Sequence, residues 1–183
     1  EKVCPKYGIS GRYYLYLGNL EPRKNISGLV EAYKKALQKC PDLPLLAIAG
    51  GRGWQYDEIF DRVKSLGLSE KVIFTGYVDD DDVPLLINGA EAFCFPSFYE
   101  GFGMPPLEAM SCGVPVIVSK TSSLPEVVGD CGISVDPYNV QEIADALIRM
   151  TDKKFCEEQR KAGIERAKTF SWEKSAELLK GLL

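Results

Sequence analysis

The sequence predicts an α/β domain built on a doubly wound parallel sheet of about six strands, with helices on both faces. Six short apolar runs alternate with amphipathic stretches along the 183 residues. The runs are continuously apolar rather than alternating with polar residues, as expected for strands that are covered on both faces. A sheet of this kind binds ligands beyond the carboxyl ends of its strands.

The individual elements follow from the periodicity of the apolar residues. The first helix places Ile26, Val30 and Tyr33 on one face, at the spacing of an amphipathic helix. Residues 1–11 are interpreted as a linker and residues 12–183 as one domain. Strands are predicted at 13–18, 43–51, 71–78, 91–97, 114–119 and 131–136. Helices are predicted at 25–40, 56–68, 105–113, 139–150, 153–168 and 171–182, with a short helix or turn at 79–90 and a helical turn at 123–130.

The composition argues against several classes of protein. With 45% hydrophobic and 26% charged residues, it is ordinary for a soluble globular domain. A net charge of −4 argues against a general nucleic-acid binder. Because no apolar run approaches 18 residues, no transmembrane helix is predicted, and the start of the sequence lacks a signal-peptide pattern.

Cysteine and histidine usage narrows the chemistry further. The six cysteines form no C-x-x-C pair, and several lie in apolar runs, which favours reduced structural thiols and a cytoplasmic location. The chain contains no histidine, which excludes Ser-His-Asp and Cys-His nucleophiles and His-containing zinc sites. Any chemistry must therefore use carboxylates, cations, hydroxyls and the backbone.

Two adjacent cations, Arg23 and Lys24, lie where the first strand leads into a helix. Asn25 follows them and is a candidate N-cap. Cations at a helix start oppose the helix macrodipole, and an anionic ligand would offset that cost. We therefore interpret the segment from Gly18 to Asn25 as an anion site. The alternative is a solvated Arg-Lys pair on a loop.

The stretch YEGFGMPPLEAM separates two carboxylates, Glu100 and Glu108, by seven residues. Gly101 and Gly103 allow positive φ and close approach of a ligand, and Pro105 suits the first turn of a helix. The two acids would flank one small volume, where each could accept hydrogen bonds from the vicinal hydroxyls of a sugar. The alternative is a structural one, in which the acids are caps on a loop.

The start of the same helix would also present free backbone amides. We expect the N–H groups near Gly103, Met104 and Leu107 to face outward and to bind an anion, as helix starts do. A phosphate group held there would lie between the two hydroxyl-binding acids. The stretch is therefore predicted to bind a phosphorylated ligand that carries sugars.

The third strand ends in GYVDDDD, residues 76–82. The aspartates Asp79–Asp82 could form a D-x-D metal site for a nucleotide sugar. We favour helix N-terminal caps instead, because acids commonly precede a short helix, and we expect no metal. The backbone at Tyr77 and Val78 would then meet the edge of a base.

Together these motifs resemble the C-terminal, donor-binding half of a family 4 retaining glycosyltransferase of the GT-B fold, a mannosyltransferase-like member of the group 1 glycosyltransferases. The resemblance covers about residues 12–182. The E-x7-E spacing of Glu100 and Glu108, with its flanks, is its specific part. The resemblance implies a Rossmann-like domain. It rests on the stretches YLGNLEPRKNISGLVEAY, LLAIAGGRGWQYDEIF, VIFTGYV, FPSFYEGFGMPPLEAMSCGVPVI and SSLPEVVGDCGISVDPYN.

The resemblance also implies roles for individual residues. Glu100 would bind hydroxyls of the donor sugar, and Glu108 the ribose hydroxyls. Lys24 would bind phosphate, with Arg23 in place of an arginine that the family often has where this chain has Asn19. Glu100, Lys24 and Arg23 are thus the candidate catalytic residues. The remaining donor-binding candidates are Gly18, Asn19, Gly101, Phe102, Gly103, Met104, Leu107 and, beside the base, Tyr77 and Val78.

The implied reaction moves a hexosyl group from a nucleoside-diphosphate sugar to an acceptor hydroxyl, with the anomeric configuration retained. GDP-mannose is the first candidate donor. Stabilisation of the leaving diphosphate would lower the barrier, without a metal or other cofactor. The alternatives are a nucleotide-sugar epimerase of the same fold and a non-catalytic nucleotide-sugar binding module.

The acceptor would be a glycan or lipid-linked saccharide, bound by an N-terminal domain that is absent from this sequence. We therefore expect the isolated domain to bind donor but to be inactive in transfer. The full-length enzyme would be cytoplasmic, at the inner face of the membrane.

Overall fold

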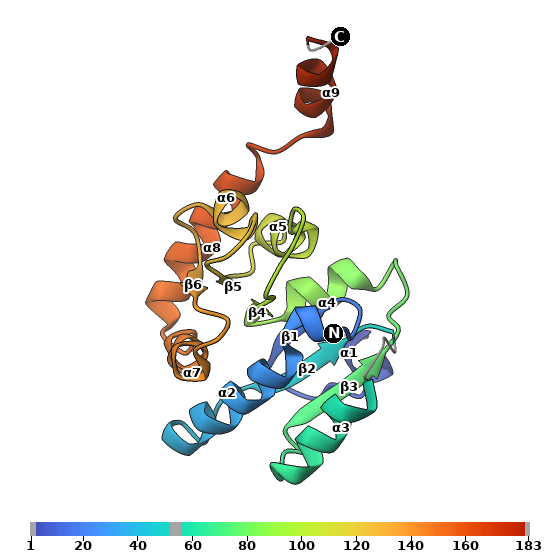
Figure 1. Cartoon of the computed structure of the whole chain (residues 1–183), viewed down its shortest axis with the longest axis vertical. Helices are drawn as coiled ribbons and strands as arrows, with labels where there is room; N and C mark the ends of the chain where they lie inside the picture. The colour runs from blue at the N-terminus through green and yellow to red at the C-terminus, as the bar shows by residue number, and fades with distance from the viewer. Residues whose placement is uncertain (1–2, 52–55, 182–183) are drawn as a thin grey trace.

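The sheet is the organising element of the structure, a computed structural model that describes residues 3–51 and 56–181. Within these ranges the chain forms one six-stranded parallel sheet in the order β3-β2-β1-β4-β5-β6 (Figure 1). The order reverses between β1 and β4, so the doubly wound prediction is confirmed. The strands are β1 Tyr13–Leu17, β2 Leu45–Ala49, β3 Val72–Gly76, β4 Ala92–Phe95, β5 Val116–Ser119 and β6 Ile133–Val135.

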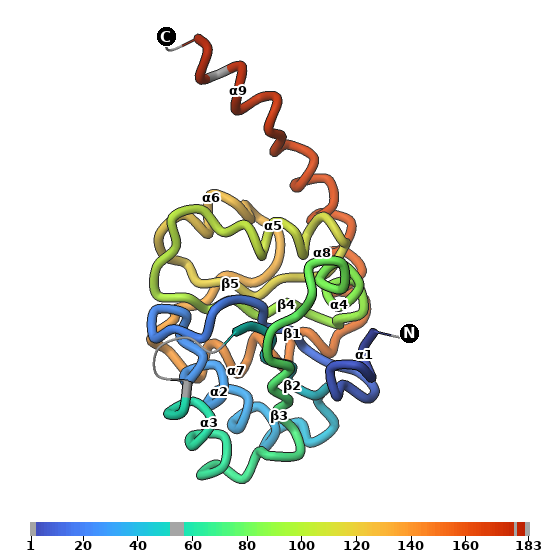
Figure 2. The backbone as a smooth tube through the Cα atoms, turned by 90° about the vertical axis from the view of Figure 1, so that its right-hand side faces the viewer, coloured from blue at the N-terminus to red at the C-terminus, as the bar shows by residue number. Residues whose placement is uncertain are grey.

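Helices cover both faces of the sheet. The helices α2, α3 and α7 pack on one face, whereas α4, α5, α6 and α8 lie on the other (Figures 1 and 2). The last helix, α9, projects away from the body of the domain (Figure 2). The helices are α1 Val3–Lys6, α2 Ile26–Lys39, α3 Tyr56–Ser65, α4 Val83–Gly89, α5 Met104–Ser111, α6 Leu124–Val128, α7 Val140–Arg149, α8 Lys153–Ala167 and α9 Trp172–Lys180, with a 3-10 turn, η1, at Pro22–Lys24.

The observed elements match the expected ones within a few residues, and two expectations reach beyond the described residues. The predicted end of the last helix at 182 lies outside them, as do positions 52–55 of the second resemblance stretch. No helix in residues 3–51 or 56–181 is long and apolar enough to cross a bilayer.

The segment before β1 is more structured than the linker interpretation implies. It begins with the short helix α1, and Ile9 is buried in the core. Lys6 and Tyr7 bond to the aspartates that follow β3. The segment is therefore fixed against the sheet, and whether it also links two domains stays a prediction.

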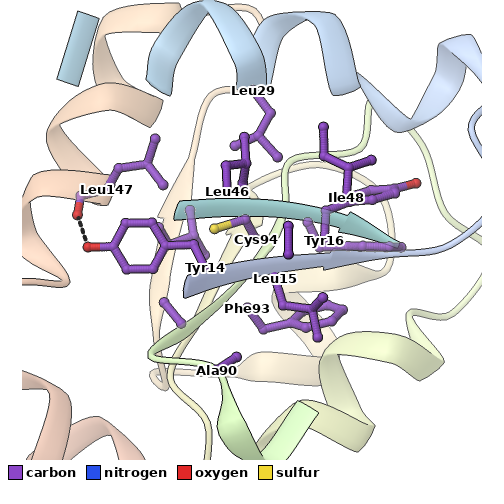
Figure 3. Packing of buried hydrophobic residues seen from close by; sticks show 14 of the residues in the cluster. Tyr14, Leu15, Tyr16, Leu29, Leu46, Ile48, Ala90, Phe93, Cys94 and Leu147 are labelled. Atoms are coloured by element: carbon purple, nitrogen blue, oxygen red, sulfur yellow. Dashed lines mark hydrogen bonds between the residues drawn. The ribbon is translucent and has the colours of Figure 1, made fainter. Parts of the chain in front are cut away.

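The core consists of side chains from both faces of the central strands. Tyr14 and Leu46 point toward α2 and α7, while Leu15 and Phe93 point toward α4 (Figure 3). The Tyr14 hydroxyl donates to the carbonyl oxygen of Leu147 at 3.0 Å, which satisfies a fully buried polar group. The six cysteines, all within the described ranges, are free thiols.

At the carboxyl edge of the sheet, the backbone after β2 lies very close to the backbone after β1. Gly50 has φ +145, and a methyl group at this position would collide with the carbonyl oxygen of Gly18. The Gly18 amide in turn donates to Ala49 at 3.0 Å. The close contact explains Gly50, the φ of +150 favours glycine at Gly18, and the amide bond fixes the start of the loop that carries Arg23 and Lys24.

Two neighbouring serines at the ends of β4 and β5 allow a stability test. The Ser97 hydroxyl is buried and has no hydrogen-bond partner among the described residues, whereas the Ser119 hydroxyl donates to the Ser97 carbonyl oxygen. An orphan buried hydroxyl costs about 1–3 kcal/mol. Ser97→Ala should therefore raise the free energy of unfolding in urea by about 1 kcal/mol, and Ser119→Ala should lower it by a similar amount. A loss in both variants would contradict this account of Ser97.

Candidate functional site

The loops after β1 and β4 meet at the carboxyl edge of the sheet. The Phe98 amide donates to the Arg23 carbonyl oxygen at 2.8 Å. Asn25 has left-handed φ and ψ of 56° and 37°, and its amide side chain donates to the carbonyls of Pro96 at 3.1 Å and Pro137 at 2.7 Å. Asn25 is therefore the N-cap residue of α2, as predicted, but its side chain makes no capping bond and joins three loops instead.

The Glu100 carboxylate binds both predicted cations. Its Oε1 atom lies 2.6 Å from Lys24 Nζ, and its Oε2 atom lies 3.2 Å from Arg23 Nη1. Lys24 is 7% exposed and Glu100 8%, and the Lys24 ammonium lies 4.7 Å from the centre of the Phe95 ring. The alternative of a solvated pair on a loop is wrong for Lys24, which forms a buried ion pair.

Arg23 is the more accessible of the two cations. Its Nε atom donates to Glu21 at 2.9 Å, and its Nη1 atom also donates to the Tyr99 carbonyl oxygen at 3.3 Å. Partial burial alone would lower the pKa of Arg23, but the carboxylates of Glu100 and Glu21 raise it above its ordinary value. Arg23 therefore carries a permanent positive charge on the solvent-exposed side of the cluster.

The segment after β5 supports the Glu100 loop, although the sequence analysis did not identify it as part of the site. The Glu100 amide donates to the Ser122 hydroxyl at 3.0 Å, and the Ser123 hydroxyl donates to the carbonyls of Glu100 at 3.0 Å and Phe102 at 2.7 Å. Ser122 has φ 56. A run of serine and threonine at a strand end was the available signal, because such hydroxyls bond to loop backbone.

The turn into α5 confirms only part of the glycine prediction. Gly103 has φ 113, and a methyl group here would meet Leu124. Gly101 is not among the described glycines with positive φ. The Leu107 amide donates to the Gly103 carbonyl oxygen at 3.3 Å, so it is not free to bind an anion, and that expectation is wrong.

The remaining predicted contacts lie on the same edge. Met104 is exposed at the first position of α5. Phe102 stacks edge-on against Phe170 with ring centres 5.9 Å apart. The Asn19 carbonyl oxygen accepts from the Tyr16 hydroxyl at 3.1 Å, which holds the β1 loop. Within the described ranges, the side chains of these residues make no hydrogen bond to the charged groups of the cluster.

Glu108 lies in different surroundings from Glu100. Its pKa is raised because neighbouring protein atoms exclude part of the solvent from the carboxyl group. The cavity of about 540 Å³ beside it is not lined by Glu100, and the single volume expected between the two acids stays a prediction. The described residues that line this cavity are Asp80, Val83, Pro84, Ile87, Glu108, Ser111 and Cys112.

One of the aspartates after β3, Asp82, is the N-cap residue of α4, but its side chain bonds elsewhere. Asp82 precedes α4, but within the described chain its side chain makes no capping bond to that helix. Instead Lys6 Nζ binds Asp79 at 2.7 Å and Asp82 at 2.6 Å, and the Tyr7 hydroxyl donates to Asp82 at 2.7 Å. The hydrogen bonds from Lys6 and Tyr7 lower the pKa of Asp82. The capping prediction is therefore confirmed for the position of Asp82 but not for its side chain, which is bound by Lys6 and Tyr7.

The same loop places Tyr77 in solvent and Val78 in the core. Tyr77 is 67% exposed and Val78 4%. Tyr77 is thus open to solvent, whereas Val78 packs in the core. Within the described ranges no group of three His, Cys, Asp or Glu side chains is arranged to hold a metal ion.

Comparison with known proteins gives concordant results. A family model described as "Glycosyl transferases group 1" matches residues 6–170. The chain is 43% identical over 173 residues to O-antigen chain mannosyltransferase B of Escherichia coli, covering 93% of this chain and 45% of that protein. The chain thus spans less than half the length of this curated relative.

Two solved structures are similar in both fold and sequence. The sucrose-phosphate synthase of Thermosynechococcus elongatus superposes with a TM-score of 0.85 at 28% identity, over 99% of this chain and 47% of that one. The C-terminal domain of a group 1 family glycosyl transferase from Francisella tularensis gives 0.80 at 28% identity, over 92% and 90%. The second similarity covers nearly a whole solved domain.

Breaking the buried pair of Lys24 and Glu100 should lower the stability of the fold. Glu100→Ala would leave a buried ammonium without its carboxylate, and breaking such a pair costs about 3–5 kcal/mol. The free energy of unfolding in urea should fall by that amount. Glu108→Ala, which removes an exposed carboxylate eight positions later, is the matched control and should change it by about 0.5 kcal/mol or less. Equal losses of unfolding free energy in the two variants would mean that the ion pair does not stabilise the fold.

Proposed function

The chain belongs to the group 1 glycosyltransferases, and from this premise we propose that it is the donor-binding part of a retaining enzyme. That enzyme would transfer a hexosyl group from a nucleoside-diphosphate sugar to an acceptor hydroxyl. The observation that carries the proposal is the cluster of Arg23, Lys24 and Glu100 at the carboxyl edge of the sheet, where doubly wound folds bind ligands. Two cations and one carboxylate offer complementary partners to a diphosphate and a sugar.

The cations would stabilise the leaving group. As the bond from the sugar to the diphosphate breaks, negative charge accumulates on the phosphate oxygens. Lys24 and Arg23 are already fixed at their positions, so they can stabilise this charge without reorganisation. In the structure both cations contact Glu100, and the diphosphate would replace that carboxylate.

Displaced from the cations, Glu100 would accept hydrogen bonds from hydroxyls of the donor sugar. Two bonds from Ser123 hold the carbonyls on either side of the turn, and the Glu100 amide donates to Ser122. The side chain can therefore change partners while its backbone stays in place. In this scheme Glu100 orients the sugar, and no protein nucleophile is needed.

The nucleoside end of the donor would lie beside α5. Glu108 would accept hydrogen bonds from the ribose hydroxyls, at the edge of a cavity whose volume suits a small ligand. The backbone from Gly101 to Met104, together with Leu107 and Gly18, would line the diphosphate. Tyr77 and Val78 would lie beside the base.

The relatives suggest the class of donor and acceptor. Because the curated relatives with 37–43% identity are named mannosyltransferases, we propose GDP-mannose as the donor. The acceptor would be a glycan or lipid-linked saccharide that binds elsewhere in a longer protein, at the cytoplasmic face of the membrane. Donor binding is then the activity expected of this chain alone.

Calorimetric titration of GDP-mannose and GDP tests the two acidic residues separately. Glu108→Gln should weaken both ligands by about 1–3 kcal/mol, since both carry the ribose. Glu100→Gln should weaken GDP-mannose by a similar amount and leave the affinity for GDP no lower, because GDP has no sugar for Glu100 and competes with it for the cations. These assignments would be refuted if Glu100→Gln weakened the binding of GDP. They would also be refuted if Glu108→Gln weakened the binding of neither ligand.

Donor binding should not depend on a metal ion. The Kd for GDP-mannose should stay the same after dialysis against EDTA and after addition of Mg²⁺ or Mn²⁺, since Arg23 and Lys24 supply the positive charge. If chelation lowered the affinity for GDP-mannose tenfold and added Mn²⁺ restored it, a divalent cation would have to bridge the diphosphate and the protein.

A further inference from the structure

A small cavity lies at the carboxyl edge of the sheet, between the starts of α2 and α3. Its volume is about 200 Å³, and the residues that line it include Glu21, Glu58, Ile59 and Phe98. Helices α2 and α3 cover one face of the sheet and α4 and α5 the other, so this cavity is distinct from the one beside Glu108. Sites for drug-sized ligands have volumes of about 300–1,000 Å³. The cavity between α2 and α3 therefore suits a ligand the size of a single ring.

The aromatic ring of Phe98 forms one wall of this cavity and is held in place by its neighbours. The Phe98 amide donates to the Arg23 carbonyl oxygen at 2.8 Å, and its own carbonyl oxygen accepts from the Thr121 hydroxyl at 3.1 Å. The ring stacks on Tyr138, with ring centres 4.8 Å apart. The face of an aromatic ring carries partial negative charge and attracts weakly positive C–H groups. Phe98 is thus a fixed platform for the apolar face of a ring with several C–H bonds.

Two carboxylates supply the polar part of the lining. Arg23 Nε donates to Glu21 Oε2 at 2.9 Å, which leaves Glu21 Oε1 with no hydrogen bond among the described residues. Glu58 is exposed on the first turn of α3, and within the same residues it has neither an ion pair nor a hydrogen bond. Free carboxylate oxygens accept hydrogen bonds from hydroxyl groups. The cavity therefore offers acceptors that match a ligand with several hydroxyls.

The charges of the cavity disfavour ionic ligands. An anion would be repelled by the two carboxylates. Because Arg23 already compensates Glu21, Glu58 is the one uncompensated acid of this pair, whereas Ca²⁺ takes six to eight oxygen ligands. A neutral ring with hydroxyls on its rim and C–H groups on its face fits both the carboxylates and Phe98. A sugar ring has this chemistry.

Arg23 connects the cavity with the charged cluster. Its Nε atom donates to Glu21 at 2.9 Å, and its Nη1 atom donates to Glu100 at 3.2 Å, so the two carboxylates contact the same guanidinium. If Glu100 binds the donor sugar, a sugar ring beside Glu21 would lie next to that sugar. Transfer between two sugars requires that they be held side by side in the right orientation.

We propose that the cavity between α2 and α3 binds one sugar ring of the acceptor saccharide. The inference rests on the proposed function and adds to it a contact for the acceptor on this chain, besides its binding elsewhere in a longer protein. Phe98 would stack on the face of the ring, while Glu21 and Glu58 would accept hydrogen bonds from its hydroxyls. No proton transfer or covalent step is involved.

The test is an NMR titration of methyl α-mannopyranoside into the isotope-labelled chain, with GDP-mannose present in excess so that it occupies the donor site. The amide resonances of Glu58 and Phe98 should shift as the mannoside is added. Glu58→Ala removes one acceptor and should weaken the mannoside about fivefold or more, the equivalent of one hydrogen bond to a charged group. Phe98→Leu keeps an apolar side chain but removes the aromatic face, and should also weaken it.

Asp57→Ala is the matched control. It removes an equal charge from the preceding position of the same helix, and Asp57 does not line the cavity, so the affinity for the mannoside should stay the same. The affinity for GDP should be unchanged in all three variants, because the proposed nucleotide contacts lie elsewhere. This second measurement shows that each variant is folded and that its donor site is intact.

The remaining outcomes separate this inference from the proposed function. The inference is overturned if the chain binds GDP-mannose but the mannoside causes no shifts at Glu58 and Phe98, or if the mannoside only displaces GDP-mannose. It is also overturned if Glu58→Ala and Asp57→Ala bind the mannoside equally well. In each of these cases the donor site remains. Failure of the unaltered chain to bind GDP-mannose would overturn the proposed function and, with it, the acceptor site.

Discussion

The buried ion pair between Lys24 and Glu100 is the contact on which the geometry of the site depends. It joins loops that are 76 positions apart in sequence and that leave two adjacent strands, β1 and β4. A buried ammonium is tolerated only where a carboxylate compensates it, so each loop restrains the other. The bonds from Ser122, Ser123 and Asn25 extend this restraint to the loops after β5 and β6.

The loop after β3 is held by a different and more exposed network. Lys6 and Tyr7 bind Asp79 and Asp82 across the edge of the sheet, and the side chains of Lys6 and Asp79 are largely open to solvent. Each such ion pair contributes at most about 1 kcal/mol, so the buried Val78 must supply much of the anchoring. The edge thus carries two independently supported regions, the charged cluster and the loop after β3.

The sequence predicts the fold well because apolar strands and amphipathic helices are local patterns. It also predicts that Lys24 and Glu100 share an edge, since both follow parallel strands. Local rules fail where distant groups compete for the same side chain. The Asn25 side chain donates to the carbonyls of Pro96 and Pro137 instead of capping its helix, and the Asp82 carboxylate accepts from Lys6. The pairing of Lys24 with Glu100 depends on β1 lying next to β4, which no short stretch of sequence specifies.

Charge compensation within the cluster bears on how the proposed site would distinguish substrate from product. Glu100 neutralises one of two adjacent cations and shares the other with Glu21. A nucleotide sugar would exchange this carboxylate for a diphosphate and supply hydroxyls to the released Glu100. A bare nucleoside diphosphate would make the same exchange but leave Glu100 without donors in a largely buried position, which is unfavourable. The same ion pair that fixes the loops would therefore favour the loaded donor over the spent one and promote product release.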